Sequence, residues 1–163
     1  MLINKDSNYS ELIYIGIGSN VGDKKLNIKR ACDFFNKHQY IQYLKAAEII
    51  ETFPWGKHDQ PDFLNSIAVI KTRFSPQILL KELKKAEKEL GRTPSEHWGP
   101  RVIDMDILLF GNRIITSSFL KIPHAQIRNR EFILSQLVDL DNDMQDPETG
   151  VLYNDYLRVL SQS

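Results

Sequence analysis

Residues 98–110 read WGPRVIDMDILLF, an apolar run that contains two acidic side chains. Successive residues of a β-strand point to opposite faces of the sheet, so Asp104 and Asp106 share one face, with Cβ atoms about 7 Å apart at a rise of ~3.3 Å per residue. Leu108 and Phe110 are expected on the face that carries the acids. The other face is uninterrupted and apolar, and we expect it to pack against helices in the core; it consists of Ile103, Met105, Ile107 and Leu109.

Two carboxylates at this separation repel each other and lose hydration unless a cation compensates them. Hard carboxylate oxygens suit Mg²⁺, whose other ligands are commonly waters and substrate phosphates. Two such ions can act together along a polyphosphate in phosphoryl transfer. The pair therefore indicates a magnesium site formed by Asp104 and Asp106. The alternative is a solvated sheet face on which the two acids pair with Arg101 or with lysines.

The segments on either side predict an alternation of strands and helices. Strands are expected, from apolar alternation or enrichment, over residues 12–17, 41–52 (with an irregular middle), 63–72 and 102–110. Helices are expected over residues 24–38, capped by Asp23, and from Ser75-Pro76 to Gly91. The order β-α-β-β-α-β is the ferredoxin-like pattern, an α+β fold in which helices pack on one face of an antiparallel sheet.

Additional elements are expected after this unit. A loop within residues 122–132 is expected to enter a strand, a further segment is expected around residues 129–140, and a helix is expected near residues 152–160. The length of 163 residues favours one domain, with residues 1–11 as a short N-terminal extension.

Composition restricts the partners and the compartment. Lys+Arg and Asp+Glu both number 21, so no net charge attracts the protein to nucleic acid or to anionic lipid. Cys32 is the one cysteine, which excludes an internal disulfide and fits a reducing compartment. The sequence contains no apolar run of about 20 residues and no signal-peptide pattern at the N-terminus. We therefore expect a cytoplasmic protein that acts on small molecules and binds neither nucleic acid nor membranes. We also expect a monomer.

A second unusual stretch, ETFPWGKHDQPDFLN, spans residues 51–65. Phe63 and Asn65 lie two residues apart and so share a strand face. An amide can donate and accept hydrogen bonds, and together with an aromatic ring it suits recognition of a flat heterocycle. The alternative is that Phe63 belongs to the core and Asn65 caps the end of the strand.

A third stretch, IPHAQIRNREF, spans residues 122–132 and brings cations and an aromatic ring together through His124, Arg128, Arg130 and Phe132. Arginine recognises phosphate well because its guanidinium is planar and permanently charged. The alternative is a solvated basic turn. Glu87, in the second helix, is either a surface acid or a partner for a ligand hydroxyl. The stretch GSNVGD at residues 18–23 lacks the spacing of a phosphate-binding loop and indicates a tight turn.

Five stretches in sequence order resemble the 6-hydroxymethyl-7,8-dihydropterin pyrophosphokinases of folate biosynthesis. They are YIGIGSNVGD, ETFPWGKHDQPDFLN, LKKAEKELGR, HWGPRVIDMDILLFGN and IPHAQIRNREFIL, and the resemblance covers residues 12–140. The resemblance implies a ferredoxin-like fold. It also implies an enzyme that transfers the pyrophosphoryl group of its co-substrate ATP to the hydroxymethyl oxygen of the pterin and releases AMP, with two Mg²⁺ ions.

The resemblance also implies roles for individual residues. Asp104 and Asp106 match the magnesium ligands and, with Arg92 and Arg101, the catalytic group. The pterin-binding positions match Thr52, Pro54, Trp55, Phe63, Asn65 and Phe132. The ATP-binding positions match Glu87, Trp98, Arg101, Ile107, Lys121, His124 and Arg130.

The sequence departs from the family pattern in a few places. The loop at residues 92–97, RTPSEH, looks about one residue short and lacks the basic residues frequent there, and Gln136-Leu137 replaces the usual Pro-Leu. No departure removes a metal ligand or the pterin-reading amide, so we expect an active enzyme. The rival hypothesis is a non-catalytic ferredoxin-like module that binds a nucleotide or RNA. Zero net charge and two acids on the sheet face argue against it, because they repel a phosphate backbone.

Overall fold

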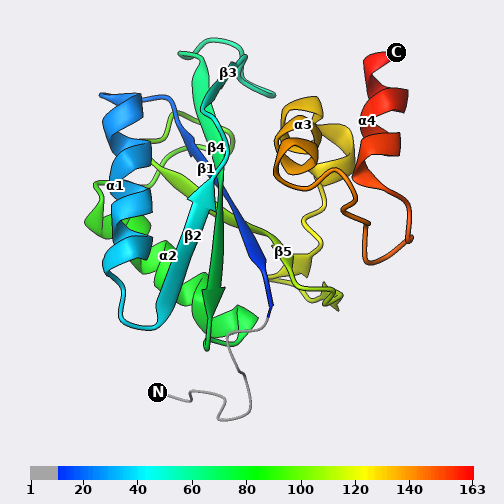
Figure 1. Cartoon of the computed structure of the whole chain (residues 1–163). Coiled ribbons are helices and arrows are strands. Elements are labelled where there is room, and N and C mark those ends of the chain that lie inside the picture. Colours follow the sequence, from blue (N-terminus) through cyan, green and yellow to red (C-terminus); the bar gives the residue numbers. More distant parts are fainter. Residues whose placement is uncertain (1–10) are drawn as a thin grey trace.

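The computed structural model describes residues 11–163 (Figure 1). Of the predicted N-terminal extension, residues 1–10 lie outside the described residues. The sheet strands and the two helices between them are β1 (Ile13–Ser19), α1 (Lys24–Lys37), β2 (Ile41–Ala46), β3 (Ile50–Thr52), β4 (Phe63–Thr72), α2 (Pro76–Glu89) and β5 (Asp104–Phe110). They are followed by β6 (Ile115–Thr116), β7 (Lys121–Ile122), a 3-10 helix (Ile127–Asn129), α3 (Glu131–Leu140) and α4 (Tyr153–Ser161).

The five-stranded sheet is antiparallel and has the order β2-β4-β1-β5, with β3 also paired to β4. This arrangement confirms the predicted ferredoxin-like fold. The strand expected over residues 41–52 is divided into β2 and β3, and both parts pair with β4. Between these two strands, Ala47 keeps the chain bonded to β4. Its N–H donates to the Ile67 carbonyl at 2.8 Å, and its carbonyl accepts from the Ser66 hydroxyl at 2.8 Å.

Helices α1 and α2 cover one face of the sheet (Figure 1). The Asp23 carboxylate caps α1 by accepting from the Leu26 N–H at 3.1 Å, and the Ser75 hydroxyl caps α2 by accepting from the Ile78 N–H at 3.3 Å. The buried side chains of the two helices recur at helical spacing and include Ile28, Ala31, Phe35, Leu79, Leu83 and Ala86. Both helices and both caps confirm the sequence predictions. Among residues 11–163, no helix has the length and apolarity that crossing a bilayer requires.

The expectation that the loop of residues 122–132 enters a strand was wrong, because this loop leads into α3. Its apolar residues Ile133, Leu134 and Leu137 are buried and follow the 3.6-residue period of a helix. Together α3 and α4, the latter predicted correctly, lie on the side of the sheet opposite α1 (Figure 1) and pack on residues of β1, β4 and β5. Helices therefore cover both faces of the sheet, although α3 and α4 leave part of their face open.

A β-bulge in β5 corrects the predicted distribution of its side chains. Ile107 pairs with Ile15 and Leu109 pairs with Tyr14, so Leu108 is left without a pairing partner in β1. Beyond the bulge the faces exchange: Phe110 joins the core beneath α1 and α2, and Leu109 joins the cluster beneath α3 and α4. The prediction that Leu109 continues the face of Ile107 was therefore wrong, because it assumed an unbroken period of two.

Candidate active site

The register of the sheet places the two acids beside glycines. Asp104 pairs with Gly18 and Asp106 with Gly16, while Gly18 also pairs with Asn65 on its other side. A Cβ atom at Gly18 would lie 3.1 Å from the Asn65 Oδ1 atom, and one at Gly16 would lie 3.4 Å from the Leu108 side chain. The missing side chains in β1 therefore leave a hollow between the amide of β4 and the carboxylates of β5.

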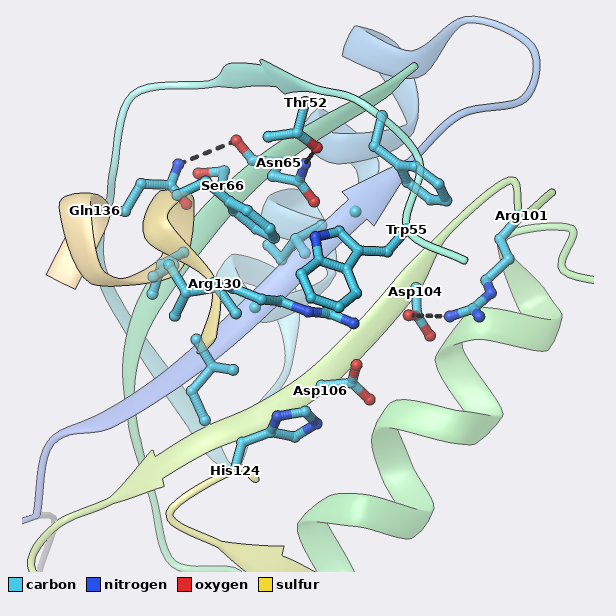
Figure 2. A pocket seen from close by; sticks show the side chains of 18 of the residues that line it. Thr52, Trp55, Asn65, Ser66, Arg101, Asp104, Asp106, His124, Arg130 and Gln136 are labelled. Atoms are coloured by element: carbon cyan, nitrogen blue, oxygen red, sulfur yellow. Dashed lines mark hydrogen bonds and ion pairs between the residues drawn. The ribbon is translucent and has the colours of Figure 1, made fainter. Parts of the chain in front are cut away.

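Two adjoining cavities share the acids. The first, which we call the sheet cavity (Figure 2), lies over this hollow; its walls include Gly16, Gly18, Thr52, Phe53, Trp55, Phe63, Asn65, Trp98, Arg101, Asp104, Asp106, His124, Arg130, Phe132 and Gln136. The second, the helix cavity, lies between α2 and the following loop; its walls include Lys84, Glu87, Lys88, Arg92, residues 93–97, Arg101, Asp104 and Asp106. Most of the predicted site residues are therefore gathered in two connected spaces.

Asp104 is held by two guanidinium groups. Arg92 donates to its Oδ1 atom at 2.6 Å and Arg101 to its Oδ2 atom at 2.5 Å. Burial raises the pKa of the Asp104 carboxyl, but Arg101, Lys84 and Arg92 outweigh this effect and hold the pKa below its usual range. The expected pairing with Arg101 is present, yet the Asp104 side chain is only 16% exposed, so this part of the face is not the solvated surface of the alternative interpretation.

Asp106 is the more open carboxylate, with 42% of its side chain exposed. It forms an ion pair with Lys84, whose ammonium group lies 3.5 Å from the Asp106 Oδ1 atom. Figure 2 shows Asp106 between His124 and Asp104, directed into the sheet cavity. One acid of the pair is therefore fixed by arginines, whereas the other presents oxygens to a ligand.

Glu87 is buried, with 2% exposure, so its interpretation as a surface acid is wrong. Its carboxylate accepts from the Met105 N–H at 2.7 Å, from the Lys84 Nζ atom at 2.9 Å and from the Arg92 Nη1 atom at 2.7 Å. Burial raises the pKa of Glu87 in spite of the opposing effect of Lys84. Glu87 thus joins α2 to β5 and directs two cations toward the acids.

The bulge in β5 also positions His124. The backbone N–H of His124 donates to the Leu108 carbonyl at 2.9 Å, and the imidazole Nδ1 atom accepts from the Gln126 N–H at 3.2 Å. Because Nδ1 is an acceptor, a neutral His124 carries its proton on Nε2. Burial lowers the pKa of His124, with smaller effects from Asp106 and Arg130. The imidazole therefore offers an N–H donor to a ligand.

Arg130 crosses the sheet cavity beneath Trp55, with its guanidinium 5.6 Å from the centre of one of the indole rings (Figure 2). Burial lowers the pKa of Arg130. Within residues 11–163 its buried Nε atom has no hydrogen-bond partner. A buried cation of this kind is suited to an anionic ligand.

Asn65 is held through both its side chain and its backbone. Its Nδ2 atom donates to the Thr52 hydroxyl at 2.7 Å, which orients the side chain, and its backbone carbonyl accepts from the Gln136 Nε2 atom at 3.1 Å. Gln136 also donates to the Glu48 carbonyl at 2.8 Å. Phe63 and Phe132 line the same cavity, so the predicted combination of aromatic rings and an amide is present. The alternative, in which Asn65 only caps a strand end, does not describe this arrangement.

Three predicted site residues have side chains that line neither cavity. Ile107 is buried in the core beneath α1 and α2, Pro54 is buried, and Lys121 is exposed on β7. Any contact of these residues with a ligand stays a prediction. The neighbour of Pro54, Phe53, lines the sheet cavity in its place, with 83% exposure.

Sequence reasoning missed two polar residues near the site. Lys84 was hidden among the many charges of α2, and only the structure shows its contact with Asp106. Asn20 belongs to the stretch predicted as a tight turn; Gly22, with φ of 70°, does make a turn there, but Asn20 is 2% exposed and hydrogen-bonded on all sides. The sequence feature that could have identified Asn20 is its position directly after β1, close to the glycines of that strand.

A cavity that presents aromatic rings and an amide, joined through two acids to a second cavity lined by charged groups, is typical of an enzyme that brings a planar ring to a phosphorylated substrate. Residues 14–142 match the family described as 7,8-dihydro-6-hydroxymethylpterin-pyrophosphokinase (HPPK). The match includes most of the chain, and the chain belongs to this family. The family predicted from the sequence is therefore confirmed.

Individual proteins that carry this enzyme name are similar to the chain over most of its length. A 2-amino-4-hydroxy-6-hydroxymethyldihydropteridine pyrophosphokinase of Aquifex aeolicus is 37% identical over 135 residues, which are 83% of this chain and 83% of the relative. The protein of the same name from Bacillus subtilis is 36% identical over 141 residues, 86% of this chain and 84% of the relative. A solved Plasmodium falciparum HPPK-DHPS structure is 16% identical and superposes over 98% of this chain with a TM-score of 0.76, which supports the fold. This chain spans 47% of that longer one.

Proposed function

We propose that the protein transfers the pyrophosphoryl group of ATP to the hydroxymethyl group of 6-hydroxymethyl-7,8-dihydropterin, giving AMP and the pterin diphosphate for folate biosynthesis. The observation that carries this proposal is the meeting of the sheet cavity and the helix cavity at Asp104 and Asp106. In this assignment the pterin occupies the sheet cavity and the polyphosphate of ATP extends from the acids into the helix cavity.

The donor set at this junction fits magnesium. Asp104 and Asp106 supply hard carboxylate oxygens. Among residues 11–163 no cluster of three or more acidic, histidine or cysteine side chains could hold a metal, so the protein would supply these two carboxylates only. Waters and ATP phosphates would complete the coordination, as is usual for Mg²⁺. We propose two ions, which when bound would neutralise charge on the phosphates.

The pterin is held by neutral groups. The Asn65 amide, oriented by Thr52, reads the polar edge of the ring, and Phe63 and Phe132 enclose its faces. Trp55 and Trp98, both about half exposed, lie over the cavity and exclude water when the ligands are bound. This arrangement orients the hydroxymethyl group toward the acids.

The reaction is an in-line substitution at the β-phosphorus of ATP. The pterin hydroxyl oxygen forms the new bond to this phosphorus, the bond to the bridging oxygen of the α-phosphate breaks, AMP leaves, and the hydroxyl proton is released. The chain contributes positioning and charge stabilisation, as is general for phosphoryl transfer. Arg92 and Arg101 are placed beside the acids, and the His124 Nε2 proton and Arg130 are further donors for phosphate oxygens.

Product analysis tests this function. The protein, ATP, Mg²⁺ and 6-hydroxymethyl-7,8-dihydropterin should give equal amounts of AMP and pterin diphosphate. Formation of ADP and a pterin monophosphate would contradict pyrophosphoryl transfer. The rival binding module is distinguished by thermal denaturation, since a ligand of the native state raises the midpoint. Stabilisation by Mg²⁺-nucleotide and pterin supports the enzyme, and stabilisation by an oligonucleotide alone supports the module.

We further propose that the enzyme works as a monomer on small molecules in the cytoplasm. The absence of net charge supports the small-molecule partners, and the single cysteine supports the reducing compartment. Light scattering of the purified protein measures its mass, and 18.9 kDa is the expected value.

A further inference from the structure

Arg128 lies close in sequence to Arg130, a proposed donor for phosphate oxygens, but it lines neither cavity. It belongs to the 3-10 helix Ile127–Asn129, which Arg130 follows directly. The Arg128 Nε atom donates to the Asp146 Oδ2 atom at 2.6 Å, and its Nη2 atom donates to the Glu148 Oε2 atom at 2.6 Å. Two carboxylates therefore hold a cation that the proposed reaction does not use.

Asp146 is a fixed anchor for this guanidinium. It is buried, with 1% exposure, and begins the turn that leads into α4 (Figure 1). Its Oδ1 atom accepts from the Glu148 N–H at 2.8 Å, its N–H donates to the Val151 carbonyl at 2.9 Å, and its carbonyl accepts from the Gly150 N–H at 2.8 Å. Arg128 compensates the charge that this turn carries in a buried position.

The turn and the 3-10 helix pack on the same part of the core. Ile127, in the 3-10 helix, and Tyr153, the first residue of α4, are both buried in the cluster beneath α3 and α4. The family match covers residues 14–142, so it includes Arg128 but not Asp146. The anchor of Arg128 thus lies beyond the segment that identifies the family.

Arg130 differs from the other arginines of the site because no carboxylate fixes it. Arg92 and Arg101 both donate to Asp104. Among residues 11–163, Arg130 forms no such ion pair, and its guanidinium lies 5.6 Å from the centre of an indole ring of Trp55 (Figure 2). The direction of the Arg130 side chain therefore depends on the position of its backbone.

The backbone of Arg130 is set by the elements on both sides of it. Its N–H donates to the Ile127 carbonyl at 3.4 Å, in the 3-10 helix, and its carbonyl accepts from the Leu134 N–H at 3.2 Å, in α3. A displacement of the 3-10 helix therefore moves Arg130. By contrast, His124 has a separate anchor in β5, since its N–H donates to the Leu108 carbonyl at 2.9 Å.

We propose that Arg128 and Asp146 are positioning residues for Arg130: their ion pair fixes the 3-10 helix and so directs the Arg130 guanidinium at the phosphates. The proposal rests on the proposed function. Pyrophosphoryl transfer depends on charges that are placed correctly before the reaction, so a small displacement of one cation lowers kcat. The turn at Asp146 thus contributes to the reaction without contact with a substrate.

The two carboxylates that hold Arg128 supply a matched pair of variants. Asp146→Asn keeps the shape of the buried side chain and removes its charge, while Arg128, whose side chain is 37% exposed, can be hydrated instead. Glu148→Gln removes an equal charge from the same guanidinium at the more exposed carboxylate. Asp146→Asn should lower kcat by about 10-fold. Glu148→Gln should keep kcat within about twofold of the wild-type value, because water can replace an exposed partner.

Binding of the pterin separates this effect from general damage to the site. The dissociation constant of 6-hydroxymethylpterin should stay within about twofold of the wild-type value in both variants, because Asn65 and Phe63 belong to β4 and do not depend on the 3-10 helix. Fluorescence titration measures this constant, and steady-state kinetics at saturating substrates measure kcat.

The route through Arg130 is tested in two further backgrounds. When Asp146→Asn is added to Arg130→Ala, kcat should fall by less than about twofold more, since the side chain that the ion pair positions is already absent. When it is added to His124→Ala, the loss of about 10-fold should persist, because His124 is anchored separately. An equal loss in both backgrounds would overturn the proposal.

A purely structural role for the ion pair would lower the thermal midpoint of Asp146→Asn and leave its kcat at the wild-type value, which would also overturn the proposal. If Asp146→Asn does not fold, Arg128→Lys keeps a cation for the buried carboxylate and serves as the second variant. It should lower kcat by about threefold, again only when Arg130 is present. A wild-type protein that forms no pterin diphosphate would instead overturn the proposed function.

Discussion

The sheet cavity and the helix cavity share Asp104 and Asp106 but are built in different ways. The proposed pterin side of the sheet cavity rests mainly on strands, with Phe132 supplied by α3. Its proposed recognition groups are neutral: two phenylalanines, a threonine and the Asn65 amide, which donates to that threonine. The helix cavity rests on one helix and one loop, and its groups are charged, with Lys84 and Arg92 held by the buried Glu87.

This difference teaches how one sheet can serve two unlike ligands. A rigid ring needs a preformed shape, which strand register and the glycines of β1 supply. A polyphosphate needs opposite charge at several points, which a network of ion pairs supplies before the ligand arrives and can rearrange when it binds. The following predictions test whether the two sides are as separate as this comparison states.

The largest effect is expected at the junction. Asp106→Ala should lower kcat by about 10³-fold or more, because it removes a proposed metal ligand and a charge that faces the phosphates. The thermal midpoint should change little, since Asp106 is 42% exposed and its ion pair with Lys84 is long, at 3.5 Å. Steady-state kinetics at saturating Mg²⁺ and thermal denaturation measure the two effects. Near-normal turnover would show that the acids do not hold the metal.

A smaller effect, confined to the sheet cavity, is expected for Asn65→Ala. The KM for the pterin should rise by about 10-fold to 100-fold, because the polar ring edge loses its partner in a buried site. The dissociation constant of Mg²⁺-nucleotide measured without pterin should stay within about twofold of the wild-type value. An equal loss of affinity for both ligands would contradict the separation of the two sides.

Salt should weaken binding in the helix cavity more than binding in the sheet cavity. Raising the ionic strength from about 0.05 to about 0.5 M should weaken nucleotide binding by about threefold to tenfold, since salt screens charges that are in part exposed. Binding of the neutral pterin alone should change by less than about twofold. Titration calorimetry of each ligand at the two ionic strengths provides the measurement, and equal salt dependence would contradict the comparison.

The smallest effect is expected for Gln136→Leu. The carbonyls of Asn65 and Glu48 lose a donor, so the free energy of unfolding should fall by about 1–2 kcal/mol. The KM for the pterin should rise by about twofold to fivefold, with kcat unchanged, because Asn65 keeps its bond to Thr52. Chemical denaturation and kinetics measure both. A loss of kcat without a change in KM would place Gln136 on the nucleotide side.

The sequence predicted those features that depend on local periodicity. The strand faces of Asp104 and Asp106, the Asp23 and Ser75 caps and the buried stripes of α1 and α2 all follow from residue spacing. The bulge at Leu108 has no local signal, because it is fixed by pairing with β1. For the same reason the exchange of Leu109 and Phe110 could not be predicted.

Long-range contacts set the limit for the site as well. Glu87 resembled a surface acid because its helix is rich in charges. Its burial depends on long-range packing against β5, where its carboxylate accepts from the Met105 N–H. Asn20 and Gln60 are 40 residues apart in sequence and meet through the fold. Helix α3 was not predicted because the interpretation of residues 122–132 rested on their cations and aromatic ring, whereas the helical period is carried by Ile133, Leu134 and Leu137, which follow that stretch.

The most direct test of the central claim is crystallographic. Crystals grown with α,β-methylene-ATP, 6-hydroxymethylpterin and Mn²⁺ in place of Mg²⁺ reveal the metal by anomalous scattering. The account predicts two anomalous peaks beside the carboxylates of Asp104 and Asp106, with the phosphates on one side and the pterin ring beside Asn65 on the other. Peaks remote from both acids, or an Asp104 that keeps both arginines while no metal binds, would contradict it.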